Sequence, residues 1–189
     1  MGLPSESSPR VDAVWRHPVY RRLLASLQRA EAAREFCRHD LQHFLDVARV
    51  CWIMLLEDGE ARELGISRDV VYAAALLHDI GRAVEYETGE SHDVAGTRIA
   101  AEILGTVEPD SRFSPDECSQ IMTAIACHRT HIGSMGAAAD LSGAPADARA
   151  RALAASLRRA DKAVRACFAC PARPRCNWPD EKKNLAIRW

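Results

Sequence analysis

The chain has 189 residues, with 25 basic and 26 acidic side chains and a formal net charge of −1. Hydrophobic residues make up 48% of it and charged residues 27%, values typical of one globular domain, so extensive disorder is excluded. The near-neutral charge argues against bulk nucleic-acid binding by phosphate neutralisation. No apolar run reaches the ~20 residues of a membrane span, and the first residues lack the apolar core of a signal peptide. We therefore expect a cytoplasmic protein with no membrane partner.

Turn and capping signals divide the chain into helices, and no stretch alternates with the period of a β-strand. We predict an all-α fold, a single-domain helical bundle spanning 14–166. A flexible tail at 1–13 precedes it, a mobile connection lies at 132–146, and a cysteine-containing segment follows at 167–189. In chain order, the expected helices cover about 18–38, 40–58, 67–81, 91–105, 114–129 and 147–167.

Capping residues indicate where the helices start. Asp40, Ser67 and Ser91 each precede an apolar helical pattern and can accept hydrogen bonds from first-turn amides. Ser114-Pro-Asp-Glu117 combines a cap, a first-turn proline and the glutamate of a capping box, so it is the strongest helix start in the sequence.

Several residues between these helices have an expected role. Gly81 and Gly105 suit the left-handed conformation that ends a helix. The acidic stretch 85–90, with three glutamates, is expected to be a solvated loop beside the mouth of the site. His39 lies four residues before His43 and is either a partner of that residue or a helix-cap residue, and we favour the cap.

Five of the expected helices turn an ionisable side chain toward an apolar face. Each of these groups lies three, four or seven residues from apolar residues, and such spacings place side chains on one side of a helix. A lone buried histidine is usually bonded to a backbone carbonyl, and a buried aspartate can pair with neighbouring arginines or lysines. A shared metal would remove the desolvation penalty of all the groups at once. The five groups are His43, His78, His92, His128 and Asp161.

Asp79 completes this set, because it directly follows His78 and can bridge two cations with its two oxygen atoms. Imidazole and carboxylate ligands suit one or two ions of iron, manganese, zinc or nickel, and magnesium is also compatible. Two ions sharing a carboxylate suit attack by a bridging hydroxide on phosphorus. The expected first site is His43, His78, Asp79 and Asp161, and the second is Asp79, His92 and His128.

Five motifs follow one another over about 36–165 and carry a family resemblance. They are His43-Phe-Leu-Asp-Val-Ala, Leu76-Leu-His-Asp-Ile-Gly-Arg82, His92-Asp-Val-Ala-Gly96, Ile125-Ala-Cys-His128 and Arg159-Ala-Asp161-Lys162. Their order and gaps resemble the HD-domain superfamily of metal-dependent phosphohydrolases. The resemblance implies hydrolysis of a phosphate monoester or diester, with a nucleotide or a small phosphorylated metabolite as the substrate.

The resemblance also implies roles for residues around the ligands. Asp79 is the central catalytic residue, and Arg82, where the family often has lysine, can grip a phosphate oxygen. Lys162 is either a substrate contact or a solvated side chain, and Arg82 is otherwise an exposed helix-end cation. Many binuclear relatives have two adjacent histidines where this chain has His128 and His131, so His131 either reaches the site or lies in a loop.

Two other functions use the same features. Some relatives in this superfamily activate oxygen, so a di-iron oxygenase is one alternative. A non-catalytic sensor that binds a nucleotide, with the cysteine segment reading the redox state, is the other. The sequence leaves the substrate and the oligomeric state open.

Three cysteines crowd together near the C-terminus as Cys167-x2-Cys170-x5-Cys176. Three thiolates are one short of a closed zinc site or of the usual ligand set of an iron–sulfur cluster. Cys37, Cys51 or a histidine such as His17 could supply the fourth ligand through the fold. The alternative is a set of reduced cysteines in a surface segment.

Overall fold

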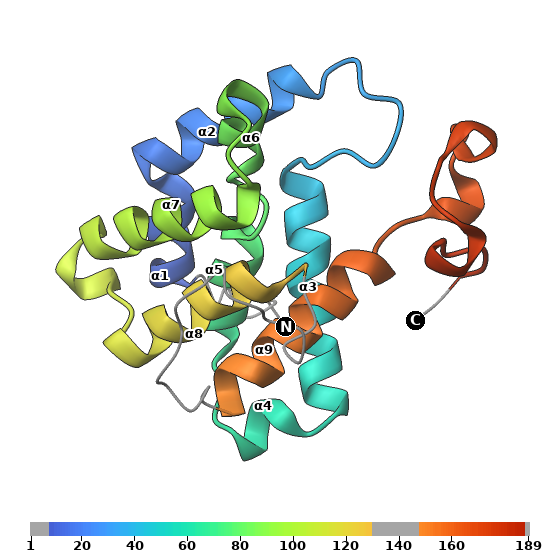
Figure 1. The fold of residues 1–189 in the computed structure, drawn as a ribbon. Helices are drawn as coiled ribbons and strands as arrows, with labels where there is room; N and C mark the ends of the chain where they lie inside the picture. Colours follow the sequence, from blue (N-terminus) through green and yellow to red (C-terminus); the bar gives the residue numbers. More distant parts are fainter. Residues whose placement is uncertain (1–7, 130–147, 188–189) are drawn as a thin grey trace, which may run out of the picture.

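A computed structural model describes residues 8–129 and 148–187 of the chain (Figure 1). These residues form an all-α bundle, and no strand occurs among them, so the predicted fold class is confirmed. The helices are α1 (Pro9–Arg16), α2 (Pro18–Ala30), α3 (Leu41–Glu57), α4 (Glu60–Glu63), α5 (Arg68–Leu77), α6 (Arg82–Thr88), α7 (His92–Thr106), α8 (Pro115–Cys127) and α9 (Ala148–Ala163). The 3₁₀ turns are η1 (Pro109–Ser111), η3 (Cys167–Ala169), η4 (Arg173–Arg175) and η5 (Asp180–Lys182).

Most of the predicted caps are confirmed. The side chain of Asp40 accepts a hydrogen bond from the His43 amide at 2.9 Å and starts α3. Ser67 caps α5 in the same way. Ser114 and Glu117 form the complete capping box of α8. Ser91 does precede α7, but its side chain makes no cap bond and instead donates to the carboxylate of Asp93, so this cap was wrong.

The N-terminal region is more ordered than predicted. Residues 9–13, expected in a flexible tail, belong to α1, which Ser8 caps and whose Val14 is buried in the core. The expected helix at 18–38 ends at Ala30, because the buried Glu31 turns back to accept from the His39 amide at 2.6 Å. The chain then runs as an irregular segment over 31–40.

The expectation for Gly81 was wrong for a physical reason. Its φ is −62°, not positive, and it precedes α6, a helix formed by most of the acidic stretch that we expected to be a loop. A Cβ at Gly81 would lie 2.1 Å from the carbonyl oxygen of His92 and 2.6 Å from the amide nitrogen of Gly96. Gly81 is therefore required for close approach to α7. Gly105 lies inside α7, which ends one residue later.

Helix α5 lies in the middle of the bundle, in contact with α1, α3, α8 and α9 (Figure 1). Seven of its ten residues are apolar and buried, including Val70, Val71, Leu76 and Leu77. Burial on every side fixes the axis of α5 and hence the position of the residues that follow it. Those residues are His78 and Asp79.

The chain after α9 has a different character. Residues 167–187, called here the cysteine segment, form short 3₁₀ turns, and among them only Ala172 is buried. Asn184 attaches this segment to the end of α9 by donating to the carbonyl oxygens of Lys162, Ala163 and Arg165. In Figure 1 the segment, drawn in red, lies to one side of the bundle.

Two further expectations concern connections and membranes. The predicted connection at 132–146 lies outside the described residues, as does His131. None of the helices in the described parts of the chain is long and apolar enough to cross a membrane.

Candidate metal centre

The candidate ligands lie at helix ends that meet at one place in the bundle. His43 is in the first turn of α3, His92 is the first residue of α7, and Asp161 is in the last turn of α9. His78 and Asp79 directly follow α5, and His128 directly follows α8. All are buried except His43, which is half-buried.

Asp79 is the centre of this arrangement. Its Oδ1 atom lies 3.2 Å from Nε2 of His92 and 3.5 Å from Nε2 of His128. Its Oδ2 atom lies 3.4 Å from Nε2 of His78. Asp79 therefore reaches histidines from three elements with its two oxygen atoms, as a bridging carboxylate requires.

The other ring nitrogens orient the histidines. Nδ1 of His78 lies 2.7 Å from the carbonyl oxygen of Ala75, and Nδ1 of His128 lies 2.6 Å from that of Ile125. Since a carbonyl only accepts, each Nδ1 carries a proton, so Nε2 is the ring atom left to bind a cation once it has lost any proton of its own. Nδ1 of His92 lies 2.9 Å from the Glu85 carboxylate, an arrangement typical of metal-binding histidines.

The inward-facing atoms have no hydrogen-bond partner. Nε2 of His43, His78, His92 and His128, and Oδ1 of Asp79, are all buried and make no hydrogen bond of good geometry, although Oδ1 lies within ion-pair distance of Arg82 Nε. Buried polar atoms without partners are costly, and a cation between them would satisfy all of them. The donor set therefore fits a metal.

The described residues contain two groups of potential ligands whose atoms all lie within 4.8 Å of one another. They share Asp79, and their membership agrees with the two sites expected from the sequence. The groups are His43, His78, Asp79 and Asp161, and Asp79, His92 and His128. In the first group, Nε2 of His43 lies 3.4 Å from Oδ1 of Asp161.

Electrostatics keep both aspartates charged. Burial alone would raise the pKa of Asp79, but the charge of His78 and the contacts with His128 and Arg82 hold that pKa well below its ordinary value. Burial likewise opposes ionisation of Asp161, and His43, His78 and Arg165 hold its pKa below the ordinary value. Both carboxylates are thus in the form that binds cations.

The two histidines of the second group differ. Burial and the charge of Arg82 lower the pKa of His92, which favours its neutral, ligating form. Burial also disfavours the charged form of His128, but its contacts with Asp79 outweigh this effect and raise the pKa of His128. His128 therefore holds its proton to a higher pH than an ordinary histidine, and a bound metal would displace that proton.

Arg82 is not the exposed helix-end cation of the alternative interpretation. Its Nε atom lies 2.9 Å from Oδ1 of Asp79, and its Nη1 atom lies 3.6 Å from Oε2 of Glu85. The side chain is 21% exposed, so it reaches the centre and still borders open space.

Sequence reasoning missed a set of residues behind Asp79. Nδ1 of His39 lies 2.7 Å from Oε1 of Glu31, and its Nε2 lies 3.5 Å from Oδ2 of Asp79. The Tyr86 hydroxyl also donates to Glu31 at 2.8 Å. The cap role favoured for His39 was therefore wrong, because Asp40 alone caps α3. The four-residue spacing from His43 was the usable signal, whereas nothing in the sequence pointed to Glu31.

Lys162 borders a pocket that opens onto the centre. The pocket has a volume of about 660 Å³, and His128 and Asp161 form part of its wall. The cysteine segment contributes the opposite wall, including Trp178. The cationic side chains that line the pocket are Arg82, Arg129, Lys162, Arg165, Lys182 and Lys183.

The three C-terminal cysteines do not reach this centre. Cys167, Cys170 and Cys176 line a second pocket, of about 460 Å³, together with Cys37. The fold thus places Cys37, one of the candidate fourth ligands, at the same pocket as the three C-terminal cysteines. Cys51 is buried in the core, and His17 caps α2.

Comparison with known proteins agrees with this geometry. Residues 40–166 match the HD domain family, which is two thirds of the chain. An uncharacterized protein of Clostridium beijerinckii is 36% identical over 157 residues, which are 83% of this chain and 84% of that protein. The comparison with solved structures gave no significant match.

Several other relatives carry the name ribonuclease Y. The protein from Desulfotalea psychrophila is 35% identical over 150 residues, and that from Syntrophotalea carbinolica is 31% identical over 150 residues. Each match covers 76% of this chain but only 25% of the relative, so the chain spans about a quarter of these proteins. The extent of the family match and the ordered His and Asp residues lead to one conclusion: this chain belongs to the HD domain family, which is part of the metal-dependent phosphohydrolase superfamily.

Proposed function

We propose that this protein is a metal-dependent phosphohydrolase that cleaves a phosphate monoester or diester in a nucleotide or a small phosphorylated metabolite. The observation that carries the proposal is the basic pocket beside the candidate metal centre. Six cationic side chains line it against two carboxylates, Asp161 and Glu181. A pocket of this charge favours an anionic substrate.

The candidate ligands would hold one ion between His43, His78, Asp79 and Asp161, and a second between Asp79, His92 and His128. When bound, iron, manganese, zinc, nickel or magnesium ions would lower the pKa of a water molecule and polarise a phosphoryl oxygen. Asp79 belongs to both ligand groups, so its two oxygen atoms would connect the two ion sites. Glu85 and the carbonyl of Ala75 fix the rings of His92 and His78, so the site needs little reorganisation.

Arg82 has a second task at the pocket wall. Its guanidinium contacts Asp79 and Glu85 but remains partly exposed, so it can offer further N–H groups to a phosphate. Lys162 is exposed as a whole residue. Partial desolvation of its ammonium group, together with the positive charge of the nearby Arg158, lowers the pKa of Lys162. These two cations would offset the negative charge that develops on the phosphoryl group.

The substrate class is supported by two further observations. A volume of about 660 Å³ is in the range of pockets for single small molecules. The relatives named ribonuclease Y make a phosphodiester of ribonucleotides a substrate that must be included in any search. The near-neutral net charge of the chain favours short substrates over long nucleic acids.

The two alternative functions fit this pocket less well. An oxygenase acting on an uncharged organic substrate gains nothing from six cations around its entrance. A nucleotide sensor without turnover would use the pocket but has no need for buried, unpartnered histidine nitrogens. Oxygen consumption without phosphate release would favour the first alternative, and saturable nucleotide binding without turnover would favour the second.

The direct test is a phosphate-release screen on the full chain loaded with each metal in turn. Nucleoside monophosphates, cyclic nucleotides, short oligoribonucleotides and common phosphate esters form the substrate panel. We expect turnover with at least one of them, and its removal by a chelator. Absence of turnover with every metal and substrate class would contradict the proposal.

A charge variant tests the pocket separately. We expect Lys162→Gln to raise KM by at least about tenfold, since a charge-assisted contact contributes about 1.5 to 3 kcal/mol and each 1.4 kcal/mol is a factor of ten. Arg98→Gln is the matched control, because Arg98 is an exposed cation paired with Glu90 and lies outside the pocket. Equal effects of the two variants on KM would remove Lys162 from the substrate site.

A further inference from the structure

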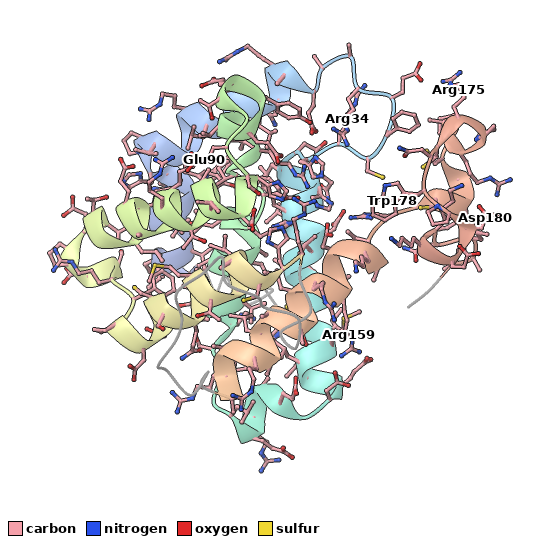
Figure 2. All side chains as sticks on the ribbon, viewed as in Figure 1. Arg34, Glu90, Arg159, Arg175, Trp178 and Asp180 are labelled. Carbon is pink, nitrogen blue, oxygen red and sulfur yellow. The ribbon has the colours of Figure 1, made fainter. Side chains whose placement is uncertain are left out.

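Four cysteines from two distant parts of the chain line one pocket. Cys37 lies in the 31–40 segment, and Cys167, Cys170 and Cys176 lie in the cysteine segment. None of the four forms a disulfide. The two segments are joined across the pocket rim by an ion pair of 2.7 Å between Arg175 and Glu35. Figure 2 shows Arg175 on the cysteine segment and Arg34 on the 31–40 segment.

The thiols interact electrostatically. Partial burial raises the pKa of Cys37, the charge of Arg165 opposes that rise, and the negative charges of Cys167 and Cys170 add to it. Cys37 therefore lies close enough to both residues to sense their ionisation. A cation among the thiols would reverse this repulsion and stabilise all of them as thiolates.

The surroundings suit a negatively charged group. Cationic side chains line the pocket in excess over the three carboxylates of Glu35, Asp40 and Asp46. A centre held by four thiolates has a net negative charge, which such a lining offsets. The cations are Arg34, Arg38, Arg165, Arg173 and Lys183.

The spacing of the thiols indicates the size of the centre. A single tetrahedral zinc ion with Zn–S bonds of about 2.3 Å places its sulfur atoms about 3.8 Å apart. The cysteines belong to neither of the two ligand groups in the described residues whose atoms all lie within 4.8 Å. No three of the four sulfur atoms therefore lie within 4.8 Å of one another, which is wider than the spacing around a single zinc ion. A cluster of several iron atoms is larger and holds its four thiolates further apart.

The cysteine segment has no hydrophobic core of its own that would stabilise its structure. Among residues 167–187 only Ala172 is buried, and Phe168, Trp178, Leu185 and Ile187 are exposed. Its described anchors are polar or aromatic contacts at its edges, such as the Arg165 guanidinium 4.2 Å over the Trp178 ring. In Figure 2, Trp178 lies on the side of the segment nearer α9 and Asp180 on the outer side. Small elements without a core of their own are commonly stabilised by a metal centre.

We propose that Cys37, Cys167, Cys170 and Cys176 are the four ligands of an iron–sulfur cluster that attaches the cysteine segment to the 31–40 segment. The proposed ligand set shares no residue with the histidine and aspartate centre, although His43 also lines the cysteine pocket, and it does not depend on the proposed hydrolase activity. Because Cys176 directly precedes Asn177 and Trp178, the cluster would also hold one wall of the basic pocket in place.

The test uses the full chain, purified without air and then reconstituted with ferrous iron and sulfide. We expect about two or about four acid-labile sulfides per chain, since both common cluster types use four cysteines. We also expect broad visible absorption that bleaches with dithionite. Zinc bound without sulfide, or no retained sulfide, would overturn the proposal.

Variants separate this site from other thiols and from the other centre. Cys37→Ser and Cys176→Ser should each lose the sulfide and the visible absorption, whereas Cys118→Ser should keep both. Cys118 is the matched control, because its thiol only donates to the Phe113 carbonyl oxygen and lies elsewhere. Asp79→Ala should keep its sulfide even if it binds no other metal. Wild-type sulfide content in Cys37→Ser would exclude it as the fourth ligand.

Discussion

The histidine and aspartate centre and the cysteine segment hold their candidate ligands by different means. In the first, each ligand lies at the end of a helix whose axis is set by burial against its neighbours. In the second, Cys37 lies in the irregular 31–40 segment, and the other three cysteines lie in or directly after short 3₁₀ turns of the cysteine segment, where only Ala172 is buried. The fold therefore places the first set before any ion binds, whereas the proposed cluster would supply the order of the second set.

The largest effect is expected from the residue that both candidate ion sites share. Asp79→Ala should lower metal-dependent turnover by at least about 10³-fold, because losing one preorganised electrostatic group alone can cost about 10²–10³. Metal content of the histidine centre should fall together with turnover. The measurements are elemental analysis and the phosphate-release assay. Unchanged metal content with full turnover would contradict the role of Asp79 as the ligand shared by both ion sites.

Close helix contact at the centre is tested by Gly81→Ala. The added Cβ would overlap the backbone of His92 and Gly96, so we expect a loss of about 3 kcal/mol in the free energy of unfolding. Urea denaturation followed by circular dichroism measures it. Gly105→Ala is the control, since a Cβ there meets nothing within 4 Å and alanine favours a helix. Equal stability of both variants would contradict the rigid helix placement.

A smaller effect is expected behind the ligands. Glu85→Gln removes the carboxylate that orients Nδ1 of His92, so metal affinity at the second group should fall about 10- to 100-fold. Titration calorimetry with the preferred metal measures this change. Glu87→Gln is the control, because Glu87 is exposed and contacts only Ser26 among the described hydrogen bonds. An unchanged affinity in Glu85→Gln would remove the second group from the metal centre.

The smallest effect is expected at the surface of the bundle. Arg159, labelled in Figure 2, forms an ion pair of 2.6 Å with Asp58 between α9 and the end of α3. Both side chains are exposed. Arg159→Ala should lower the free energy of unfolding by less than about 1 kcal/mol. A larger loss in a denaturation experiment would show that this contact, and not burial alone, fixes α9.

The sequence was sufficient to predict the fold class and the sets of residues that come together. Helical periodicity and caps such as Asp40 and Ser114 are local signals, and the inward-facing histidines follow from the same periodicity. Their assembly around Asp79 needed only the assumption that buried ionisable groups share a partner.

What the sequence could not predict depends on contacts between distant residues. Gly81 resembles a helix end, and only the proximity of α7 explains why it has no side chain. Glu31 ends α2 and holds His39 through a contact across an irregular segment. The acidic stretch forms α6, because Glu85 binds His92 and Glu31 binds Tyr86 from neighbouring elements.

The central claim is that the buried histidine and aspartate side chains bind a metal ion. A crystal structure of the metal-loaded protein, with anomalous scattering measured at the absorption edge of the metal, tests this claim most directly. We predict an anomalous peak within about 2.0 to 2.3 Å of Nε2 of His78 and of a carboxylate oxygen of Asp79, on the side that His43 and Asp161 face. A loaded crystal with no peak among these four side chains would contradict the account.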